Sequence, residues 1–268
     1  MAAKLDIREV SKLYGEEGAR PVHALDAVSL EIEQGEFVSL LGPSGCGKST
    51  LLYIIAGFEP ASSGEVRVNG RVVTGPGADR GMVFQDYALF PWKTVLQNIT
   101  FGLEIRGLAA AQCRAIAEEH IAFVGLTGFE DKYPHQLSGG MRQRCALARC
   151  VANNPEVLLM DEPLAAIDAL TRQSLQEEIL RVASAREGRA RRTVVYVTHS
   201  IEEAVFMSDR IVLMSPRPGR VLKIVDVPFG RPRDDATRLL PRYQVLCGEI
   251  WQALKDHLAT SLKKERQS

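Results

Sequence analysis

Apolar and polar residues follow two different patterns along this chain, and each pattern predicts its own kind of strand. Segments at residues 5–10, 28–32 and 65–73 alternate between apolar and polar positions, and an Asn-Gly pair at 69–70 divides the last of them. Such alternation is typical of half-buried strands joined by tight turns. We therefore expect a small antiparallel sheet near the N-terminus.

Three denser apolar runs predict strands that are buried on both faces. They lie at residues 36–42, 156–162 and 193–199, and each is short and rich in leucine or β-branched residues. A helix-like segment follows each run, which is typical of a parallel sheet covered by helices. Residues 209–227 predict a hairpin that turns at 216–219. The core of the chain is therefore expected to be α/β.

A long helical stretch interrupts this core. Residues 87–155 show helical periodicity with little strand signal, and Ser138 is suited to cap the last helix of the stretch. We interpret this stretch as a helical subdomain inserted into an α/β domain of residues 1–230. Residues 231–268 are expected to form a linker rich in proline and arginine, a C-terminal helix and a basic tail.

Composition narrows the possible partners of the chain. Among 268 residues, Lys+Arg and Asp+Glu both total 33, and a formal charge of zero argues against nucleic acid as the main partner. No stretch approaches the length of a membrane-spanning helix, and residues 1–10 lack the apolar core of a signal peptide. The cysteines are scattered and expected to be reduced: Cys46, Cys113, Cys145, Cys150 and Cys247. We expect a cytosolic protein that reaches a membrane only through a partner.

The glycine-rich segment after the first buried run predicts a phosphate site. Residues 42–49 fit the pattern G-x-x-x-x-G-K-[ST] between a predicted strand and a predicted helix, which is the context this motif requires. The glycines permit a tight turn, the helix N-terminus presents N–H groups, Lys48 adds a charge on the β- and γ-phosphates, and Ser49 can coordinate Mg²⁺. The residues expected to contact nucleotide here are Gly42, Pro43, Ser44, Gly45, Cys46, Gly47, Lys48, Ser49 and Thr50.

Polar side chains follow the other buried strands. Asp161 and Glu162 are adjacent carboxylates, which are costly at a strand end unless a cation or a reacting water occupies the site. Asp161 is expected to hold Mg²⁺ and Glu162 to act as the general base; the alternative is that both cap the next helix. His199 is expected to contact the γ-phosphate, although a structural histidine is the alternative. Gln85, at the end of a predicted strand at 81–85, is expected to reach Mg²⁺ or the attacking water.

A second anion site is predicted in the helical stretch. Ser138, Gly139 and Gly140 precede a helix that carries arginines, which gives a second helix N-terminus suited to an anion. A simple helix cap with flexible glycines is the alternative. A chain with one complete phosphate loop and one partial anion site suggests a head-to-tail pair in which each copy completes the other's site.

Taken together, these motifs resemble the ATPase subunit of an ABC transporter over residues 4–230. The elements that carry the resemblance are, in chain order, residues 42–49, Gln85, residues 137–140, residues 157–162, Asp168 and His199. The resemblance implies a P-loop NTPase (RecA-like) α/β core with an N-terminal antiparallel β subdomain and an inserted α-helical subdomain. It also implies a dimer that sandwiches two ATP molecules between one subunit's phosphate loop and the other's Ser-Gly-Gly. Tyr14 would then stack on adenine, and Asp168 would communicate across the dimer interface.

Residues 85–107, 133–144 and 194–221 resemble, more narrowly, the nitrate/sulfonate/taurine group of bacterial importers. This implies membrane-spanning permease subunits as partners, a periplasmic substrate-binding protein as an indirect partner, and a peripheral location on the cytoplasmic face of the inner membrane. The aromatic segment Phe90-Pro91-Trp92 would meet the permease, and packing inside the helical subdomain is the alternative for Phe90.

Two departures from the family pattern leave the chemistry intact. Met141 stands where glutamine is commoner, and Ala165 lies in LAAID where a different pattern is more usual. Neither residue is a phosphate ligand or a carboxylate, so ATP hydrolysis is expected to persist.

We therefore expect an ATP-hydrolysing subunit, with ATP and Mg²⁺ as ligands, that drives uptake of a small anion such as nitrate, a sulfonate or taurine. Its partners would be a second ATPase subunit, expected to be a second copy, and the permease. The alternatives are the ATPase of an exporter or of an importer for another solute, and a P-loop phosphotransferase, which has no use for the Ser-Gly-Gly element.

Overall fold

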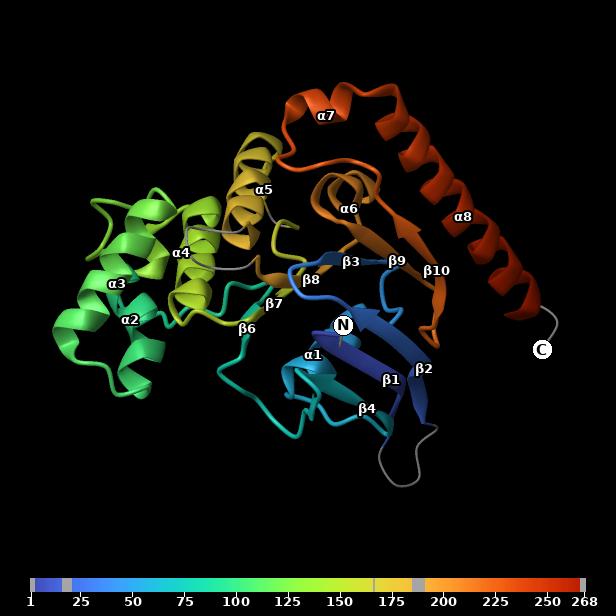
Figure 1. Cartoon of the computed structure of the whole chain (residues 1–268), viewed down its shortest axis with the longest axis horizontal. Helices are drawn as coiled ribbons and strands as arrows, with labels where there is room; N and C mark the ends of the chain where they lie inside the picture. The colour runs from blue at the N-terminus through green and yellow to red at the C-terminus, as the bar shows by residue number, and fades with distance from the viewer. Residues whose placement is uncertain (1–2, 16–20, 166, 185–190, 266–268) are drawn as a thin grey trace. The chain divides into compact units, whose positions relative to one another are not determined.

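The computed structural model describes residues 3–15, 21–165, 167–184 and 191–265. The chain separates into two compact units (Figure 1): unit 1 comprises Met1–Gly77 and Ala185–Ser268, and unit 2 comprises Ala78–Ser184. The end of the predicted basic tail, residues 266–268, lies outside the described part of the chain.

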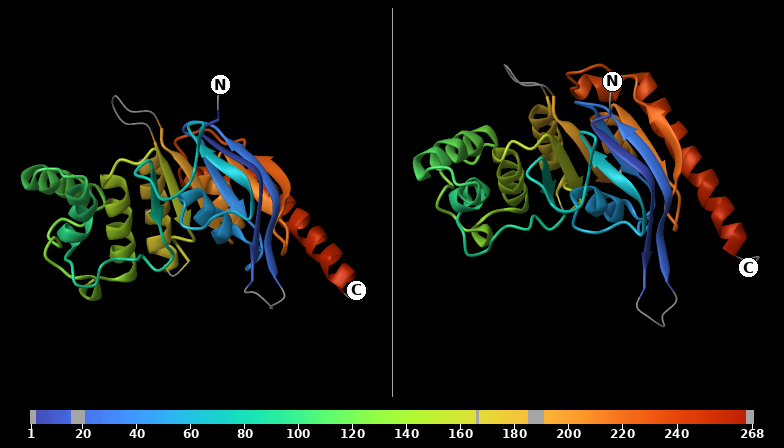
Figure 2. Two further views of the ribbon diagram at one scale, coloured as in Figure 1. Left: turned by 90° about the horizontal axis from the view of Figure 1, so that it is seen from below. Right: turned by 60° about the horizontal axis from the view of Figure 1, so that its bottom comes forward.

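The predicted N-terminal antiparallel sheet is present in unit 1. Its strands pair in the order β2-β1-β4-β5 and are β1 (Leu5–Tyr14), β2 (Val22–Ile32), β4 (Ser63–Val68) and β5 (Arg71–Val72). Figure 2 shows β1 and β2 as a long paired ribbon. Asn69 and Gly70 between the last two strands have φ values of 51° and 75°. Both positions of a two-residue hairpin turn of this kind need positive φ, which confirms the predicted Asn-Gly turn.

Unit 1 also contains parallel strands built from the apolar runs. The strands are β3 (Phe37–Leu41), β8 (Thr193–Thr198) and β9 (Arg210–Met214), with β10 (Val221–Asp226) antiparallel to β9. Every residue of β3 and β8 is buried, as expected for strands covered on both faces. Helix α1 (Lys48–Ala56) packs against β8 and β2, and helix α6 (Ile201–Met207) packs against β3 and β8.

The C-terminal part of unit 1 is helical. Helix α7 (Asp235–Leu239) leads into the long helix α8 (Pro241–Glu265), which packs against α6 (Figure 1). Tyr243, Leu246 and Ile250 are buried, and their spacing of three and four residues places them on one face of α8. The C-terminal helix is therefore held to unit 1 by one apolar stripe.

Unit 2 combines a parallel strand pair with helices. Its elements are β6 (Arg80–Val83), β7 (Val157–Asp161), α2 (Val95–Ile105), α3 (Ala110–Phe123), η1 (Pro134–Gln136), α4 (Gly139–Ala152) and α5 (Ala169–Ala183). Side chains from α2, α3 and α4 form a core that includes Ile99, Ile121 and Cys145. The predicted helical stretch lies inside this unit, which additionally contains β6, β7 and α5. None of the helices in the described residues has the length and apolar character that crossing a membrane would require.

Candidate functional site

The predicted phosphate loop of unit 1 connects β3 to α1. Gly47 is the N-cap of α1, with φ 97° and no side-chain cap. A Cβ at this position would lie 2.7 Å from Leu25 Cδ2 and 2.8 Å from the Ala24 carbonyl oxygen. Gly45 also has a positive φ, 73°. Both the backbone conformation and the close approach of β2 therefore require glycine at position 47.

Lys48 lies beneath the loop with its charge directed at the loop backbone. The side chain is buried, and Nζ donates hydrogen bonds to the carbonyl oxygens of Gly42 at 2.8 Å and Pro43 at 3.0 Å. The Cys46 sulfur lies 3.8 Å from the same Nζ, and burial raises the pKa of that thiol although the Lys48 charge opposes the rise. The loop thus holds an ammonium group at the start of a helix, which is a site suited to phosphate.

His199 and Tyr14 lie on strand ends of the same unit. The parallel register of β3 and β8 pairs Leu41 with Thr198, so Gly42 and His199 leave their strands at the same end. His199 is exposed there. Tyr14 is 38% exposed at the end of β1. Unit 1 therefore gathers the phosphate loop and the predicted γ-phosphate contact at one sheet edge.

The β1 strand end is linked to the phosphate loop through β2. Leu25, which approaches Gly47, is the register partner of Lys12, two residues before Tyr14. The Lys12 ammonium lies 4.8 Å from the centre of the Tyr14 ring. Tyr14 therefore carries its aromatic ring on the strand that pairs with the β2 segment contacting the phosphate loop.

The predicted carboxylates and Gln85 lie together at one end of the strand pair in unit 2. Strands β6 and β7 are parallel with Val83 opposite Met160, so Asp161, the last residue of β7, and Gln85, two residues beyond β6, lie at the same end of the pair. Asp161 is 3% exposed. Glu162 has φ 44°, a left-handed conformation that is rare outside glycine and is concentrated at functional sites.

Two expectations about these residues are corrected by the structure. The helix after β7 begins at Ala169 and is capped by Asp168, whose side chain accepts a hydrogen bond from the Thr171 N–H at 3.1 Å. The alternative in which Asp161 and Glu162 cap the next helix is therefore wrong. Gln85 was expected at the end of a strand, but β6 ends at Val83 because the chain turns immediately afterwards.

The turn that carries Gln85 is tied to helix α4. The Tyr87 N–H donates to the Phe84 carbonyl at 3.2 Å, and Tyr87 itself has φ 62°. Arg149 of α4 donates to the carbonyl oxygens of Ala88 at 2.6 Å and Tyr87 at 3.0 Å. Burial lowers the pKa of Arg149. Nothing in the sequence around Gln85 signalled this anchor, because it depends on a distant arginine.

The predicted second anion site is the N-terminus of α4. Ser138 caps this helix, and its side chain accepts a hydrogen bond from the Met141 N–H at 3.2 Å. A Cβ on Gly140 would lie 2.6 Å from Thr171 Cγ2 of α5, whereas a Cβ on Gly139 would meet nothing closer than 3.4 Å. Gly140 thus allows two helices to approach closely, which is a role beyond the flexibility considered above.

The two departures from the family pattern also have places in unit 2. Met141 packs against the apolar core of the helices. Ala165 is exposed and donates its N–H to the Glu162 carbonyl at 3.2 Å. Each residue therefore serves local packing or turn geometry.

An apolar pocket with a basic rim lies next to this turn within unit 2. Its volume is ≈ 460 Å³, and its lining includes Phe84, Phe90, Phe101, Ile105, Arg106 and Arg149 but no acidic residue. Phe90 packs edge-to-face on Phe101 with ring centres 4.6 Å apart, and it also lines the pocket, so both interpretations of Phe90 stay open.

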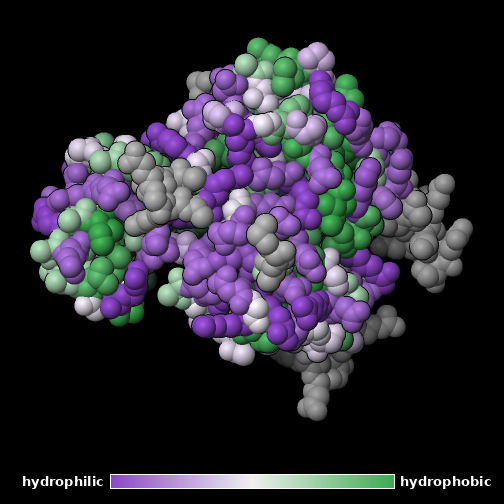
Figure 3. Space-filling view, viewed as in Figure 1, coloured by the Kyte–Doolittle hydropathy of each residue, from purple (hydrophilic) through white to green (hydrophobic). Residues whose placement is uncertain are grey.

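Large apolar side chains remain at the surface beside this pocket. Trp92 is 70% exposed and Ile105 is 72% exposed. Figure 3 shows hydrophobic side chains at the surface over the α2–α3 part of the molecule. Exposed aromatic and aliphatic groups at the edge of a pocket indicate an interaction surface.

Comparison with known proteins agrees with this geometry. The family model described as ABC transporter matches residues 25–165. The taurine import ATP-binding protein TauB of Jannaschia sp. is 47% identical over 232 residues, which cover 87% of this chain and 85% of TauB. The chain belongs to the ABC transporter family. The bicarbonate transport ATP-binding protein CmpD of Synechocystis sp. is 46% identical over 235 residues, 87% of this chain and 82% of CmpD.

The solved structures agree with this family assignment. The ATP-binding cassette MJ0796, a dimer in a post-hydrolysis state bound to ADP and Pi, has a TM-score of 0.74 and 33% sequence identity, covering 84% of this chain and all of that chain. The predicted P-loop NTPase fold and the resemblance to the importer group are thereby confirmed. The chain is an ATP-binding subunit of the ABC family, whose members hydrolyse ATP.

The described residues contain no group of three or more His, Cys, Asp or Glu side chains that could hold a metal ion by themselves. Mg²⁺ prefers to keep waters and phosphate oxygens as ligands and needs only one or two protein groups. Within unit 2, the buried carboxylate of Asp161 is a group of the kind that Mg²⁺ accepts as a ligand.

Proposed function

We propose that this chain hydrolyses ATP to drive uptake of a small anion such as nitrate, a sulfonate or taurine. The preformed phosphate loop carries the proposal, because Lys48 and the N-terminus of α1 already present their positive charge at one place. The relatives named above support the importer assignment, since taurine carries a sulfonate and bicarbonate is itself a small anion.

We assign the residues of the nucleotide site as follows. Tyr14 stacks on adenine, the loop of residues 42–50 binds the phosphates, and His199 contacts the γ-phosphate. Ser49, Gln85 and Asp161 would hold Mg²⁺, which would neutralise charge on the phosphates. Glu162 polarises the attacking water as general base. The left-handed backbone at Glu162 supports this role, since strain of this kind costs about 1–3 kcal/mol and persists where function requires the geometry.

A second copy of the chain completes each site. Ser138, Gly139 and Gly140 at the N-terminus of α4 would face the γ-phosphate held by the partner's loop, and Asp168 would lie near the same interface. Ser138 is exposed although it caps its helix, which leaves the helix N-terminus accessible to an anion. The γ-phosphate would therefore bridge the two copies only while ATP is intact, and hydrolysis would release the two copies from each other.

The permease would dock on unit 2. Trp92 offers an exposed aromatic anchor, and the neighbouring pocket offers an apolar floor with arginines and no acidic residue at its edge. An amphipathic helix with an acidic end fits that chemistry. Arg149, which lines this pocket, is hydrogen-bonded to the turn that carries Gln85. Movement of the permease at the pocket would therefore shift Gln85 in the nucleotide site. We infer that the subunit works at the cytoplasmic face of the membrane, with a periplasmic binding protein supplying the solute from the other side.

The Glu162→Gln substitution tests the core of this proposal. ATP hydrolysis should stop, while ATP still binds and traps a dimer that light scattering detects. The matched control is Glu119→Gln on the exposed face of α3, which should keep both hydrolysis and reopening. Hydrolysis by Glu162→Gln at the unmodified rate would overturn the general-base assignment, and a monomer with bound ATP would overturn the shared site.

A further inference from the structure

The segment that follows β10 donates hydrogen bonds to both ends of helix α6. At the start of the helix, the Tyr243 hydroxyl of α8 donates to the Glu202 carbonyl at 2.8 Å. At the other end, the Arg233 guanidinium donates to the carbonyl oxygens of Phe206 at 2.9 Å and Ser208 at 2.6 Å. The Arg233 side chain is 0% exposed. A buried guanidinium that donates to the last carbonyl oxygens of a helix caps that end, and its positive charge interacts favourably with the negative end of the helix dipole.

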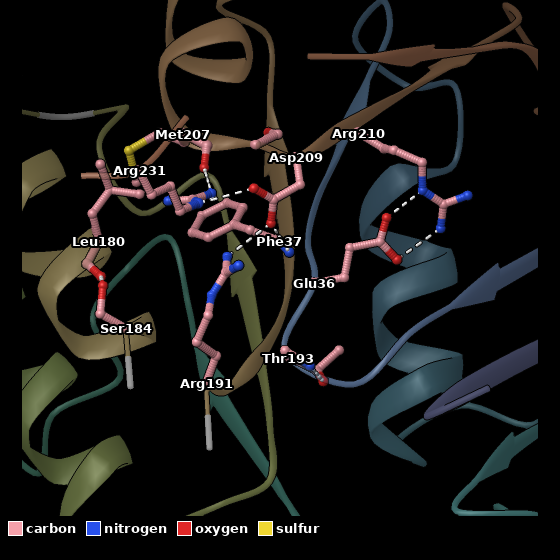
Figure 4. Close-up of polar contacts among 12 residues, drawn as sticks. Glu36, Phe37, Leu180, Ser184, Arg191, Thr193, Met207, Asp209, Arg210 and Arg231 are labelled. Atoms are coloured by element: carbon pink, nitrogen blue, oxygen red, sulfur yellow. Dashed lines mark hydrogen bonds and ion pairs between the residues drawn. The ribbon is translucent and has the colours of Figure 1, made fainter. Parts of the chain in front are cut away.

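A second arginine ties the same segment to the parallel strands. Arg231 donates to the Asp209 carboxylate and to the Met207 carbonyl, at 2.9 and 2.6 Å (Figure 4). Asp209 also accepts hydrogen bonds from Arg191 and from the Phe37 N–H, both at 2.9 Å. The segment is therefore fixed to the beginning of β3 as well as to the end of α6.

Helix α6 in turn fixes the residues on both sides of His199. The Glu203 carboxylate, which is buried, accepts hydrogen bonds from Thr198 Oγ1 at 2.8 Å and from the Tyr196 hydroxyl at 3.1 Å. The Ser200 N–H donates to Thr198 Oγ1 at 3.0 Å. His199 thus projects from a short loop whose two neighbours are bonded to each other and to α6.

Helix α6 depends on outside support for its order. It spans Ile201–Met207, seven residues, whereas isolated helices shorter than about 12–15 residues are marginal in water. The contacts from Tyr243 and Arg233 support the helix at its two ends, where such a short helix frays. Their loss would loosen the helix and, through Glu203, the loop that carries His199.

We propose that residues 231–250 form a positioning element for His199, with Arg233 and Tyr243 acting through α6. The proposal rests on the function proposed above for His199. Loosening α6 would displace the imidazole from the γ-phosphate while leaving the phosphate loop, and hence ATP affinity, as it is. Displacement of a reacting group by about 1 Å can cost on the order of a hundredfold in rate, so a partial loosening should cost about tenfold in kcat.

The experiment uses the full chain and compares kcat with nucleotide affinity. Arg233→Met removes the donors but keeps an unbranched side chain, and Tyr243→Phe removes a single hydroxyl in case the first variant fails to fold. Both should lower kcat, by about tenfold for Arg233→Met and less for Tyr243→Phe, with the Kd for ATP within about twofold. The control is Arg242→Met, because Arg242 pairs with Glu249 on the exposed side of α8 and makes no contact with α6 among its described bonds. It should leave kcat unchanged.

A double-mutant cycle with His199→Ala identifies the route of the effect. If the segment acts through His199, Arg233→Met should lower kcat in the parent protein and have no further effect in the His199→Ala background. An equal fall in both backgrounds, or unchanged kcat in both C-terminal variants, overturns the inference. Unchanged kcat in His199→Ala alone instead refutes the role proposed for His199, so the two failures are distinguishable.

Discussion

Replacing Gly140 by alanine tests how closely helix α4 approaches helix α5. The added Cβ would lie 2.6 Å from Thr171 Cγ2, well inside the separation of about 3.5–4.0 Å at which carbon atoms make favourable contact. A threonine in a helix has few side-chain conformations available, so Thr171 cannot simply swing away. One of the two helices must shift, or the threonine must adopt a strained conformation.

The expected magnitude follows from two opposing effects. Overpacking typically costs about 1–3 kcal/mol, whereas alanine in place of glycine in a helix gains roughly 0.5–1 kcal/mol. Gly140→Ala should therefore reduce the free energy of unfolding by about 1 kcal/mol. Thr171→Ser removes Cγ2 and with it the close contact. In that background Gly140→Ala should increase the free energy of unfolding by about 0.5 kcal/mol, so the sign of the effect reverses.

Urea unfolding followed by circular dichroism, on the parent chain, both single variants and the double variant, measures this coupling. A coupling energy near zero would refute the close approach of the two helices. ATP hydrolysis by the double variant then separates packing from chemistry. If Gly140 serves only the close packing, the Gly140→Ala/Thr171→Ser chain should regain hydrolysis together with stability, because the added methyl group is directed at position 171 of α5.

Two further predictions concern stability. Burial raises the pKa of Asp209, but the hydrogen bond and charge of Arg231, the Phe37 N–H and the Arg191 charge together lower the pKa below its ordinary value. Above its unfolded pKa of about 3.9, Asp209 therefore adds to the free energy of unfolding, and this contribution is lost as the pH falls through the lower folded pKa. Below about pH 4, the urea midpoint should consequently fall less steeply for Asp209→Asn than for the parent chain. Thr94 forms a capping box at the start of α2, so Thr94→Ala should lower the free energy of unfolding by about 1 kcal/mol and Thr94→Ser should retain most of it; equal midpoints for all three chains would contradict this.

Local features of the sequence were sufficient to predict the strands and the helix cap. The apolar runs that became β3 and β8 have every residue buried, because a strand covered on both faces has no position exposed to solvent. The Asn-Gly turn between β4 and β5 and the cap at Ser138 were also predictable, because each depends on the conformation or hydrogen bonding of its own residues. Such signals are complete within a few positions of the chain.

Contacts between distant residues left no comparable signal. From the sequence, Gly140 is predicted only to be flexible, whereas in the structure a Cβ at this position would contact Thr171 of α5. No sequence pattern around either residue encodes this close approach of the two helices. Arg149 and Arg233 read as ordinary charged positions in helical or linker sequence. In the structure, the guanidinium of each arginine donates hydrogen bonds to backbone carbonyl oxygens of a separate element. Sequence reasoning finds residues whose chemistry is local, and it misses those that hold other residues in place.

Hydrogen bonds within the chain fix the shape of the phosphate loop. A buried ammonium is costly unless its donors are satisfied, and Lys48 satisfies two of them with the Gly42 and Pro43 carbonyls. These same bonds hold the loop open in the shape that Gly47 permits, with β2 pressed against it. Phosphate oxygens would therefore exchange for, or add to, bonds already formed, and little binding energy would be needed to order the loop. A loop ordered in advance leaves more of the binding energy of ATP for joining the two copies, which is the step that the proposed cycle requires.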